Sequence, residues 1–159
     1  MKYYPLRLSR KAGFSLMEVM VACGLLALTA AAAIGTLVRL NYFAALSRLQ
    51  TGASTVAQEH IDRILEDGPF NPRKNQIPEV LELGTHTVGT ETKPTVPIYT
   101  DPDTNEVVVY GWLTSTVTES TRSYGPWQIK LRNADVTVAY RFRDKPYSVR
   151  MSTVRSPDA

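Results

Sequence analysis

The sequence predicts an α+β chain in which one long N-terminal helix precedes an antiparallel β-sheet. Two changes in hydrophobic pattern predict this fold. A charge-free apolar run from Val19 to Val38 passes into an amphipathic helical pattern that stops at Gly68-Pro69. From Val96 onward apolar and polar residues alternate with a period of two, which is typical of strands with one buried face. The 159 residues allow one small domain in addition to the apolar helix.

The first thirteen residues form a basic leader. They contain four cations and no acid, namely Lys2, Arg7, Arg10 and Lys11. The remaining residues carry 14 basic against 15 acidic side chains, so the formal net charge of +3 comes from the leader. Positive flanks of apolar helices stay in the cytoplasm, so we expect a cytoplasmic N-terminus and an extracytoplasmic domain after Val38. The high pI therefore does not indicate a nucleic-acid-binding protein.

Residues 14–38 predict a membrane-spanning helix. The twenty uncharged residues from Val19 to Val38 would measure about 30 Å as a helix, the thickness of the hydrocarbon core of a bilayer. The single cysteine, Cys23, lies within this run, so no disulfide framework is expected. Glu18 at the start of the run needs an explanation, because a carboxylate costs about 2.5–3.5 kcal/mol at the centre of a bilayer and less near its edge.

Three hypotheses account for this region. A secretory signal would be cut near the small residues 30–33, but the apolar run is long for one and contains Glu18. A plain membrane anchor has no need of a carboxylate. A cut between Gly13 and Phe14 would create an α-ammonium on Phe14 and would place Glu18 fifth in the mature chain. A buried charge needs a partner, and an amino terminus of the same or a neighbouring helix could provide it.

The third hypothesis is supported by a family resemblance. The stretch from Lys11 to Val19 resembles the class III leader of type IV pilins and pseudopilins, in which a basic leader ends in Gly, a Phe follows, and a Glu stands fifth after the cut. The resemblance implies a pilin-like roll and cleavage after Gly13 by a prepilin peptidase, followed by N-methylation of Phe14. It also implies that Glu18 pairs with the amino terminus of another pilin or pseudopilin subunit. Many major pilins have a helix-bending proline in this segment, where this chain has Gly35.

Residues 39–67 predict an amphipathic continuation of the helix. Apolar and small residues recur three or four positions apart and form one stripe. This stripe contains Tyr42, Leu46, Leu49, Ala53, Val56, His60 and Ile64. We expect His60 to be a partly buried structural residue, because the other histidine, His86, falls in a region predicted to be a loop.

Residues 68–95 predict a long connecting loop, and residues 96–159 predict the sheet. Segments 96–99 and 106–113 flank a turn sequence and are predicted to form a hairpin. Residues 127–132 alternate, and residues 136–142 place Val136, Val138 and Tyr140 on one face. The hairpin of residues 136–155 resembles the closing hairpin of minor pilins and minor pseudopilins, which favours a minor subunit.

The turn at residues 101–105 offers a weak candidate for a calcium site. Asp101, Asp103 and Asn105 have the one-three-five spacing of oxygen ligands in calcium loops. However, Glu106 occupies the position of the loop glycine, and Trp112 occupies that of the bidentate glutamate. A plain hairpin turn with Pro102 at its second position is the favoured interpretation, and we expect no metal or other cofactor.

Charge is distributed unevenly along the domain. Residues 122–155 contain eight Arg or Lys and two Asp, whereas residues 59–119 contain eleven acids and four bases. A match between these regions, within or between subunits, is the favoured explanation. A DNA-binding surface is the less favoured one. Its candidate residues are Arg132, Arg141, Arg143 and Arg150 with Tyr140 and Tyr147.

The sequence contains no catalytic motif, phosphate-binding loop or metal-spaced His/Cys cluster, so we do not expect an enzyme. The predicted function is that of a minor subunit of a type IV pilus or a type II secretion pseudopilus. The expected partners are a prepilin peptidase, other subunits and the inner membrane, and nucleic acid is not an expected partner. The alternative is a single-pass, membrane-anchored extracytoplasmic binding protein, such as a DNA-uptake receptor or an adhesin.

Overall fold

The computed structural model describes residues 13–158 and divides the chain into two compact units, residues 1–43 and 44–159. Lys2, Arg7, Arg10 and Lys11 of the predicted leader lie outside the described residues. Helix α1, Leu16–Glu66, contributes to both units as one uninterrupted helix of 51 residues. This confirms the predicted long helix, which Gly35 does not interrupt. The helix is long and apolar enough to span a membrane.

In the first unit the described side chains are exposed, with Tyr42 half-buried. Large apolar side chains such as Leu26 (70% exposed) and Leu28 (70%) lie on all sides of the helix without covering residues. A helix that is apolar all round requires lipid or other helices as its surroundings. The first unit therefore has the surface of a membrane or bundle helix.

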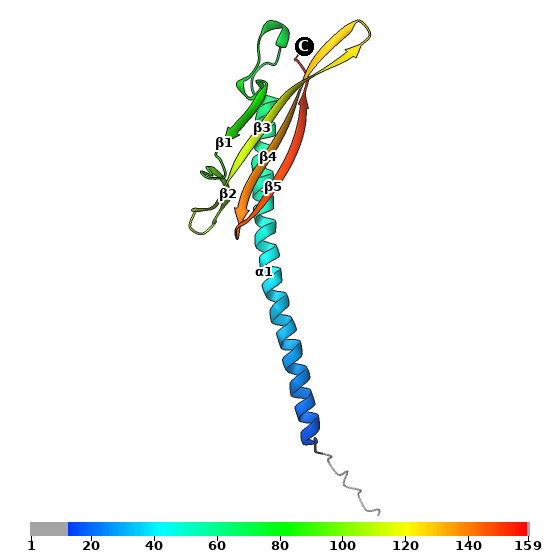
Figure 1. The fold of residues 1–159 in the computed structure, drawn as a ribbon, viewed down its shortest axis with the longest axis vertical. Helices are drawn as coiled ribbons and strands as arrows, with labels where there is room; N and C mark the ends of the chain where they lie inside the picture. The colour runs from blue at the N-terminus through cyan, green and yellow to red at the C-terminus, as the bar shows by residue number, and fades with distance from the viewer. Residues whose placement is uncertain (1–12, 159) are drawn as a thin grey trace, which may run out of the picture. The chain divides into compact units, whose positions relative to one another are not determined.

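The second unit contains an antiparallel sheet (Figure 1). Its strands are β1 (Gly84–Val88), β2 (Val96–Thr100), β3 (Val107–Tyr124), β4 (Trp127–Phe142) and β5 (Lys145–Arg155). The strand order is β1-β3-β4-β5, and β2 pairs with the part of β3 that precedes the β1 contact. Two 3₁₀ turns, Pro72–Lys74 and Glu79–Leu81, follow the helix.

The structure corrects the predicted loop of residues 68–95, because residues 84–88 form strand β1. His86 lies in this strand opposite Ser115 of β3, and not in a loop. The segment Thr85-His86-Thr87 favours a strand only through its β-branched threonines and lacks the alternation of apolar and polar residues that predicts the other strands. Pairing with β3, about thirty residues further along the chain, is what extends it.

The hydrophobic core lies between the second half of α1 and one face of the sheet. Buried helix residues are Leu49, Ala53, Ala57, Ile61 and Ile64. Buried strand residues include Leu113, Val117, Val136, Val138 and Tyr140. The predicted α+β arrangement and the shared face of Val136, Val138 and Tyr140 are therefore confirmed. Tyr140 also stacks on Tyr147 of β5, with ring centroids 5.7 Å apart.

Gly52 permits close packing between the helix and β2. A Cβ atom at this position would collide with the backbone carbonyl oxygen of Ile98. A glycine in mid-helix costs about 1 kcal/mol relative to alanine, and here the absent side chain allows the two backbones to approach closely.

The alternation in residues 127–132 does not place Ile129 and Leu131 toward the core. Strands β3 and β4 pair in one unbroken register from Gly111↔Tyr140 to Tyr124↔Trp127. Because Val136 and Val138 fix which face is buried, Arg132 points inward and is 5% exposed. Ile129 lies on the opposite face and is exposed.

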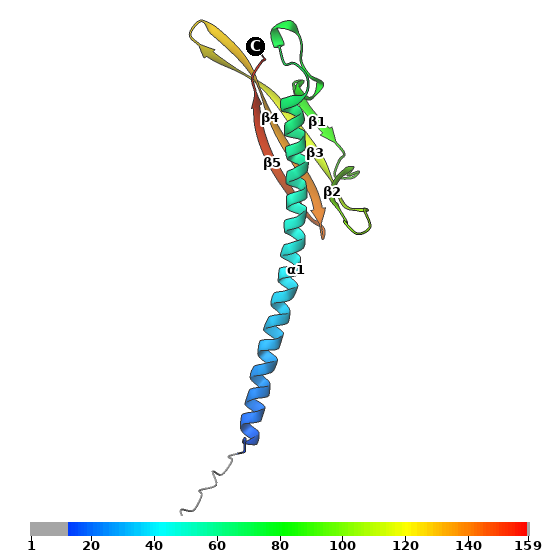
Figure 2. The ribbon, with the colours of Figure 1, turned by 180° about the vertical axis from the view of Figure 1, so that it is seen from behind.

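Strands β3 and β4 extend beyond their neighbours. Pairing with β1 reaches only Val117 of β3, and pairing with β5 begins only at Arg132 of β4. Residues 118–131 therefore form a two-stranded hairpin, here called the β3–β4 arm, which projects past the rest of the sheet (Figures 1 and 2).

Candidate processing and assembly site

The start of α1 carries the residues predicted for processing. Ser15 caps the helix, since its Oγ accepts a hydrogen bond from the Glu18 amide at 3.2 Å. The carbonyl oxygen of Ser15 accepts from the amides of Glu18 (3.1 Å) and Val19 (3.2 Å). Ser15-x-x-Glu18 is the sequence pattern of a capping box. The predictions from sequence missed this cap, although the pattern was its signal.

Glu18 therefore lies in the first turn of the helix, where the unpaired amides and the helix dipole favour a negative charge. Its side chain is exposed and forms no ion pair within residues 13–158. A carboxylate in this position is available to a cation from outside the described chain.

Phe14 and Glu18 lie on one face of the chain. Together with Ala22 and Leu26 they line a shallow, mostly apolar hollow on the helix surface. The Phe14 side chain is 81% exposed. Cys23 lines the same hollow as an exposed free thiol. The structure thus brings Phe14 and Glu18 together, as their spacing of four predicts.

The comparison with family models gives one match. The family described as "Prokaryotic N-terminal methylation motif" matches residues 8–34. The chain carries the N-terminal methylation motif of type IV pilin-like proteins. No curated protein and no solved structure gives a significant match.

The methylation motif includes Gly13, Phe14 and Glu18, so the match falls on the residues that carry the resemblance. It supports a processed pilin-like or pseudopilin-like subunit that is anchored in a membrane. Proteins with this motif are structural subunits that a prepilin peptidase processes and that assemble with other subunits.

Outside the methylation motif, the turn at residues 101–105 is a tight hairpin turn. The Asp101 amide donates to the Glu106 carbonyl oxygen at 2.9 Å, and the Asn105 amide donates to the Asp101 carbonyl oxygen at 2.8 Å. Oδ1 of Asp101 accepts from the Asp103 amide at 2.9 Å, which forms an Asx turn. This is the geometry of the plain turn. A calcium site at Asp101, Asp103 and Asn105 stays a prediction.

His60 lies half-buried on the sheet-facing side of α1. Burial, and then the charges of Arg63 and His86, lower its pKa, while Glu59 opposes them. His60 lines a hollow with Val88 and Thr95. Among the described residues no group of three His, Cys, Asp or Glu side chains has the arrangement of a metal site.

The residues considered for DNA binding do not form one surface. Arg132 is buried and lies 3.0 Å from Oε2 of Glu119, and Tyr140 is 1% exposed. Arg141 and Arg150 are exposed but form ion pairs with Glu91 (3.3 Å) and Asp135 (3.2 Å). The pairs Arg141–Glu91 and Arg132–Glu119 join the basic region to the acidic region, as expected from the charge distribution of the chain. Arg150 instead pairs with Asp135 within the basic region.

Arg155 is a structural residue that the sequence did not reveal. Its Nη1 donates to the carbonyl oxygens of Ile64 (2.8 Å) and Asp67 (3.0 Å), and its Nη2 donates to that of Gly68 (2.6 Å). The last carbonyls of a helix have no partners within the helix. Arg155 therefore caps the end of α1 from β5.

Proposed function

We propose that this chain is a minor pilin-like subunit that is cut after Gly13, methylated on Phe14 and assembled into a type IV pilus or a type II secretion pseudopilus. The observation that carries the proposal is that Phe14 and Glu18 line one hollow at the exposed start of α1, within the segment that matches the methylation motif. The sheet of the second unit would provide the surface that distinguishes this subunit from the other subunits of the filament.

The proposed boundaries follow the chemistry of the segments. Residues 1–13 are the leader, residues 14–38 lie in the inner membrane with the N-terminus in the cytoplasm, and the domain after Val38 is periplasmic or extracellular. Cleavage exposes an α-ammonium on Phe14, beside a bilayer in which an unpaired charge is costly. Glu18 of one subunit and Phe14 of a neighbour would neutralise each other as the helices come together.

Two substitutions separate this role of Glu18 from capping of its own helix. A capping box accepts glutamine in place of glutamate, but glutamine has no charge. If charge pairing recruits the neighbour, Glu18→Gln and Glu18→Ala both leave cleavage intact and both reduce assembly. If the residue serves only as a cap, Glu18→Gln assembles normally.

The measurement is incorporation of the subunit into filaments or cross-linked complexes with its partner subunits in cells. Glu66→Gln, which removes an exposed acid at the other end of the same helix, is the matched control and should assemble normally. Normal incorporation of both Glu18 variants would contradict the proposal. It would instead favour a single-pass anchored binding protein in which Glu18 is incidental.

A further inference from the structure

We propose that the open edge of β4 in the β3–β4 arm is a docking site for an extended acidic segment of a partner protein, which adds to the sheet as a strand. This surface belongs wholly to the second unit. It involves neither Gly13 nor Glu18, so it stands independently of the proposed processing.

The first observation is that β4 lacks a neighbour along the arm. Strand β5 pairs with β4 from Phe142↔Lys145 to Arg132↔Arg155 and then leaves the sheet. Residues 127–131 of β4 therefore pair only with β3 and present a free edge. A free strand edge carries unpaired amide and carbonyl groups and is a template for an incoming strand.

The second observation is why β5 leaves. Segment 156–158 turns toward the residues after the helix, where Oδ2 of Asp158 accepts from the Phe70 amide at 2.7 Å. The Asp158 amide donates to the Phe70 carbonyl oxygen at 2.8 Å. Because Arg155 is also bound to the helix end, this part of the chain is held away from β4 by several bonds.

The third observation is that a cleft occupies the vacated space. It has a volume of about 560 Å³ and lies between the β4 edge, segment 156–158 and the first 3₁₀ turn. The β4 edge contributes Gln128, Ile129 and Lys130, and the opposite wall contributes Pro72 and Arg73. An incoming strand beside β4 would lie in this cleft.

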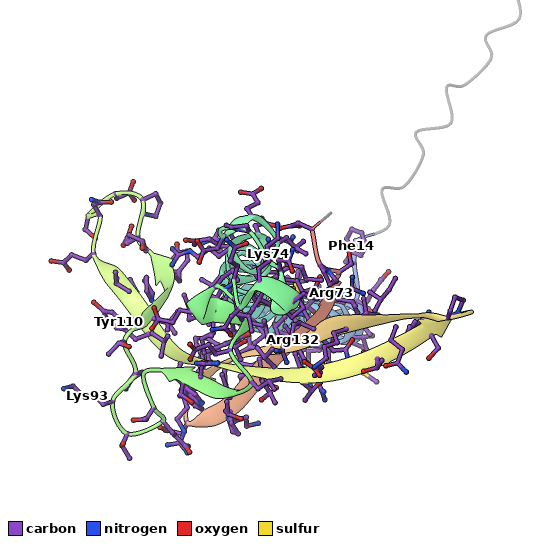
Figure 3. All side chains as sticks on the ribbon, turned by 90° about the horizontal axis from the view of Figure 1, so that it is seen from above. Phe14, Arg73, Lys74, Lys93, Tyr110 and Arg132 are labelled. Carbon is purple, nitrogen blue, oxygen red and sulfur yellow. The ribbon has the colours of Figure 1, made fainter. Side chains whose placement is uncertain are left out.

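The charges around the cleft favour an acidic occupant. Glu119 is shared by two cations of β4, since Oε1 lies 3.1 Å from Lys130 and Oε2 lies 3.0 Å from Arg132. Arg132 points toward the core, is 5% exposed and does not line the cleft, so Lys130 and Arg73 are the cations that an occupant would meet. Arg73 is exposed and forms no ion pair within residues 13–158. Figure 3 shows Arg73 and Arg132 near the base of the projecting arm.

The remaining carboxylate at the cleft does not cancel this excess. Asp158 is already bound to the Phe70 amide and lies 3.5 Å from Arg155. Carboxylates on alternate residues of an added strand would point to the same side. They could therefore meet Arg73 and Lys130 while the backbone of the strand pairs with β4.

An isolated two-stranded hairpin is marginally stable in water. An added third strand would extend the sheet along the arm and would protect the amides of residues 127–131. The other free edge, residues 118–124 of β3, does not line this cleft and should remain unprotected. This difference distinguishes strand addition at β4 from general binding to the arm.

The test uses the full chain in detergent micelles and a labelled short peptide in which glutamate alternates with valine. Fluorescence anisotropy should show saturable binding, and hydrogen exchange should show protection of residues 127–131. Arg73→Glu should weaken binding by about tenfold, the effect of one charge contact of 1.4 kcal/mol. The matched control Lys93→Glu, an exposed lysine outside the cleft, should change it by less than about twofold.

Four results would overturn the proposal. One is absence of binding to a chain whose circular dichroism shows it folded. The second is protection of residues 118–124 in place of 127–131. The third is binding of the peptide by Arg73→Glu as tightly as by the natural chain. The fourth is equally tight binding of an oligonucleotide of the same charge, which would indicate a general attraction to anions.

Discussion

Nη1 of Arg155 donates a hydrogen bond of 2.8 Å to the carbonyl oxygen of Ile64, and so joins the end of β5 to the end of α1 across 91 residues of sequence. Arg155 is 7% exposed, and its guanidinium also lies 5.9 Å from the ring centre of Phe70. The helix end, the segment that follows it and the last strand therefore meet at one side chain. Its removal would take this donor from the buried carbonyl of Ile64 and from the partly buried carbonyls of Asp67 and Gly68.

Arg155→Ala should lower the free energy of unfolding of the sheet domain by about 2–4 kcal/mol. Hydrogen bonds from a charged group are lost, and one buried and two partly buried carbonyls lose their donor. Arg150→Ala, which removes an exposed arginine paired with Asp135, should cost less than about 1 kcal/mol. Urea unfolding of both variants in detergent provides the comparison. Equal losses would show that Arg155 does not stabilise the domain through the helix end.

Gly52→Ala should destabilise the domain by about 1–3 kcal/mol, because a methyl group would force the helix away from Ile98. The higher helix propensity of alanine offsets part of this cost. Gly35→Ala is the control, since a Cβ atom at Gly35 would meet nothing within 4 Å. Thermal unfolding of the sheet domain should be unaffected by Gly35→Ala. If Gly52→Ala also left the unfolding temperature unchanged, that result would contradict the close packing of α1 on β2.

Ser115→Ala should leave stability unchanged or raise it by up to about 1 kcal/mol. Ser115 is fully buried, and its Oγ has no hydrogen-bond partner among the described residues. Removal of an unsatisfied hydroxyl removes a desolvation cost at the expense of a small void. The urea unfolding midpoints of the natural chain and of Ser115→Ala test this. A decrease in the free energy of unfolding of more than about 1 kcal/mol would show that the Ser115 hydroxyl has a hydrogen-bond partner in solution.

His60 should make the domain less stable as the pH falls below about 6.5, the usual pKa of histidine. Burial, Arg63 and His86 lower the pKa of His60 in the folded chain, so the unfolded chain binds the proton first. The contribution of His60 to stability is therefore full above the pKa that His60 has in the unfolded chain. It declines as the pH falls toward the lower pKa that His60 has in the folded chain. Urea midpoints at pH 7.5 and 5.5 should differ more for the natural chain than for His60→Gln. Equal differences would show that another group causes the pH dependence.

The helix and the closing strands could be predicted because their signals are local. The charge-free run and the amphipathic stripe extend over many turns, and Val136, Val138 and Tyr140 alternate within one strand. The processing site was likewise predicted from a contiguous stretch, and the family model matches that stretch.

The remaining features depend on contacts between distant residues. Strand β1 has little apolar pattern of its own and is defined by pairing with β3. Arg132 points inward because the register of β4 is fixed by residues further along the strand and because Glu119 is placed opposite it. The free edge of β4 exists because β5 departs at Arg155. No local pattern in the sequence carries these relationships.

The central claim is that Gly13-Phe14 is a processing site, and the N-terminus of the mature protein tests it most directly. The chain should be produced with and without an active prepilin peptidase and its N-terminus identified by mass spectrometry. With the peptidase we predict a chain that begins with N-methylated Phe14, and without it a chain that retains the leader. A mature start beyond Ala30, or a retained Met1 in the presence of an active peptidase, would contradict the account.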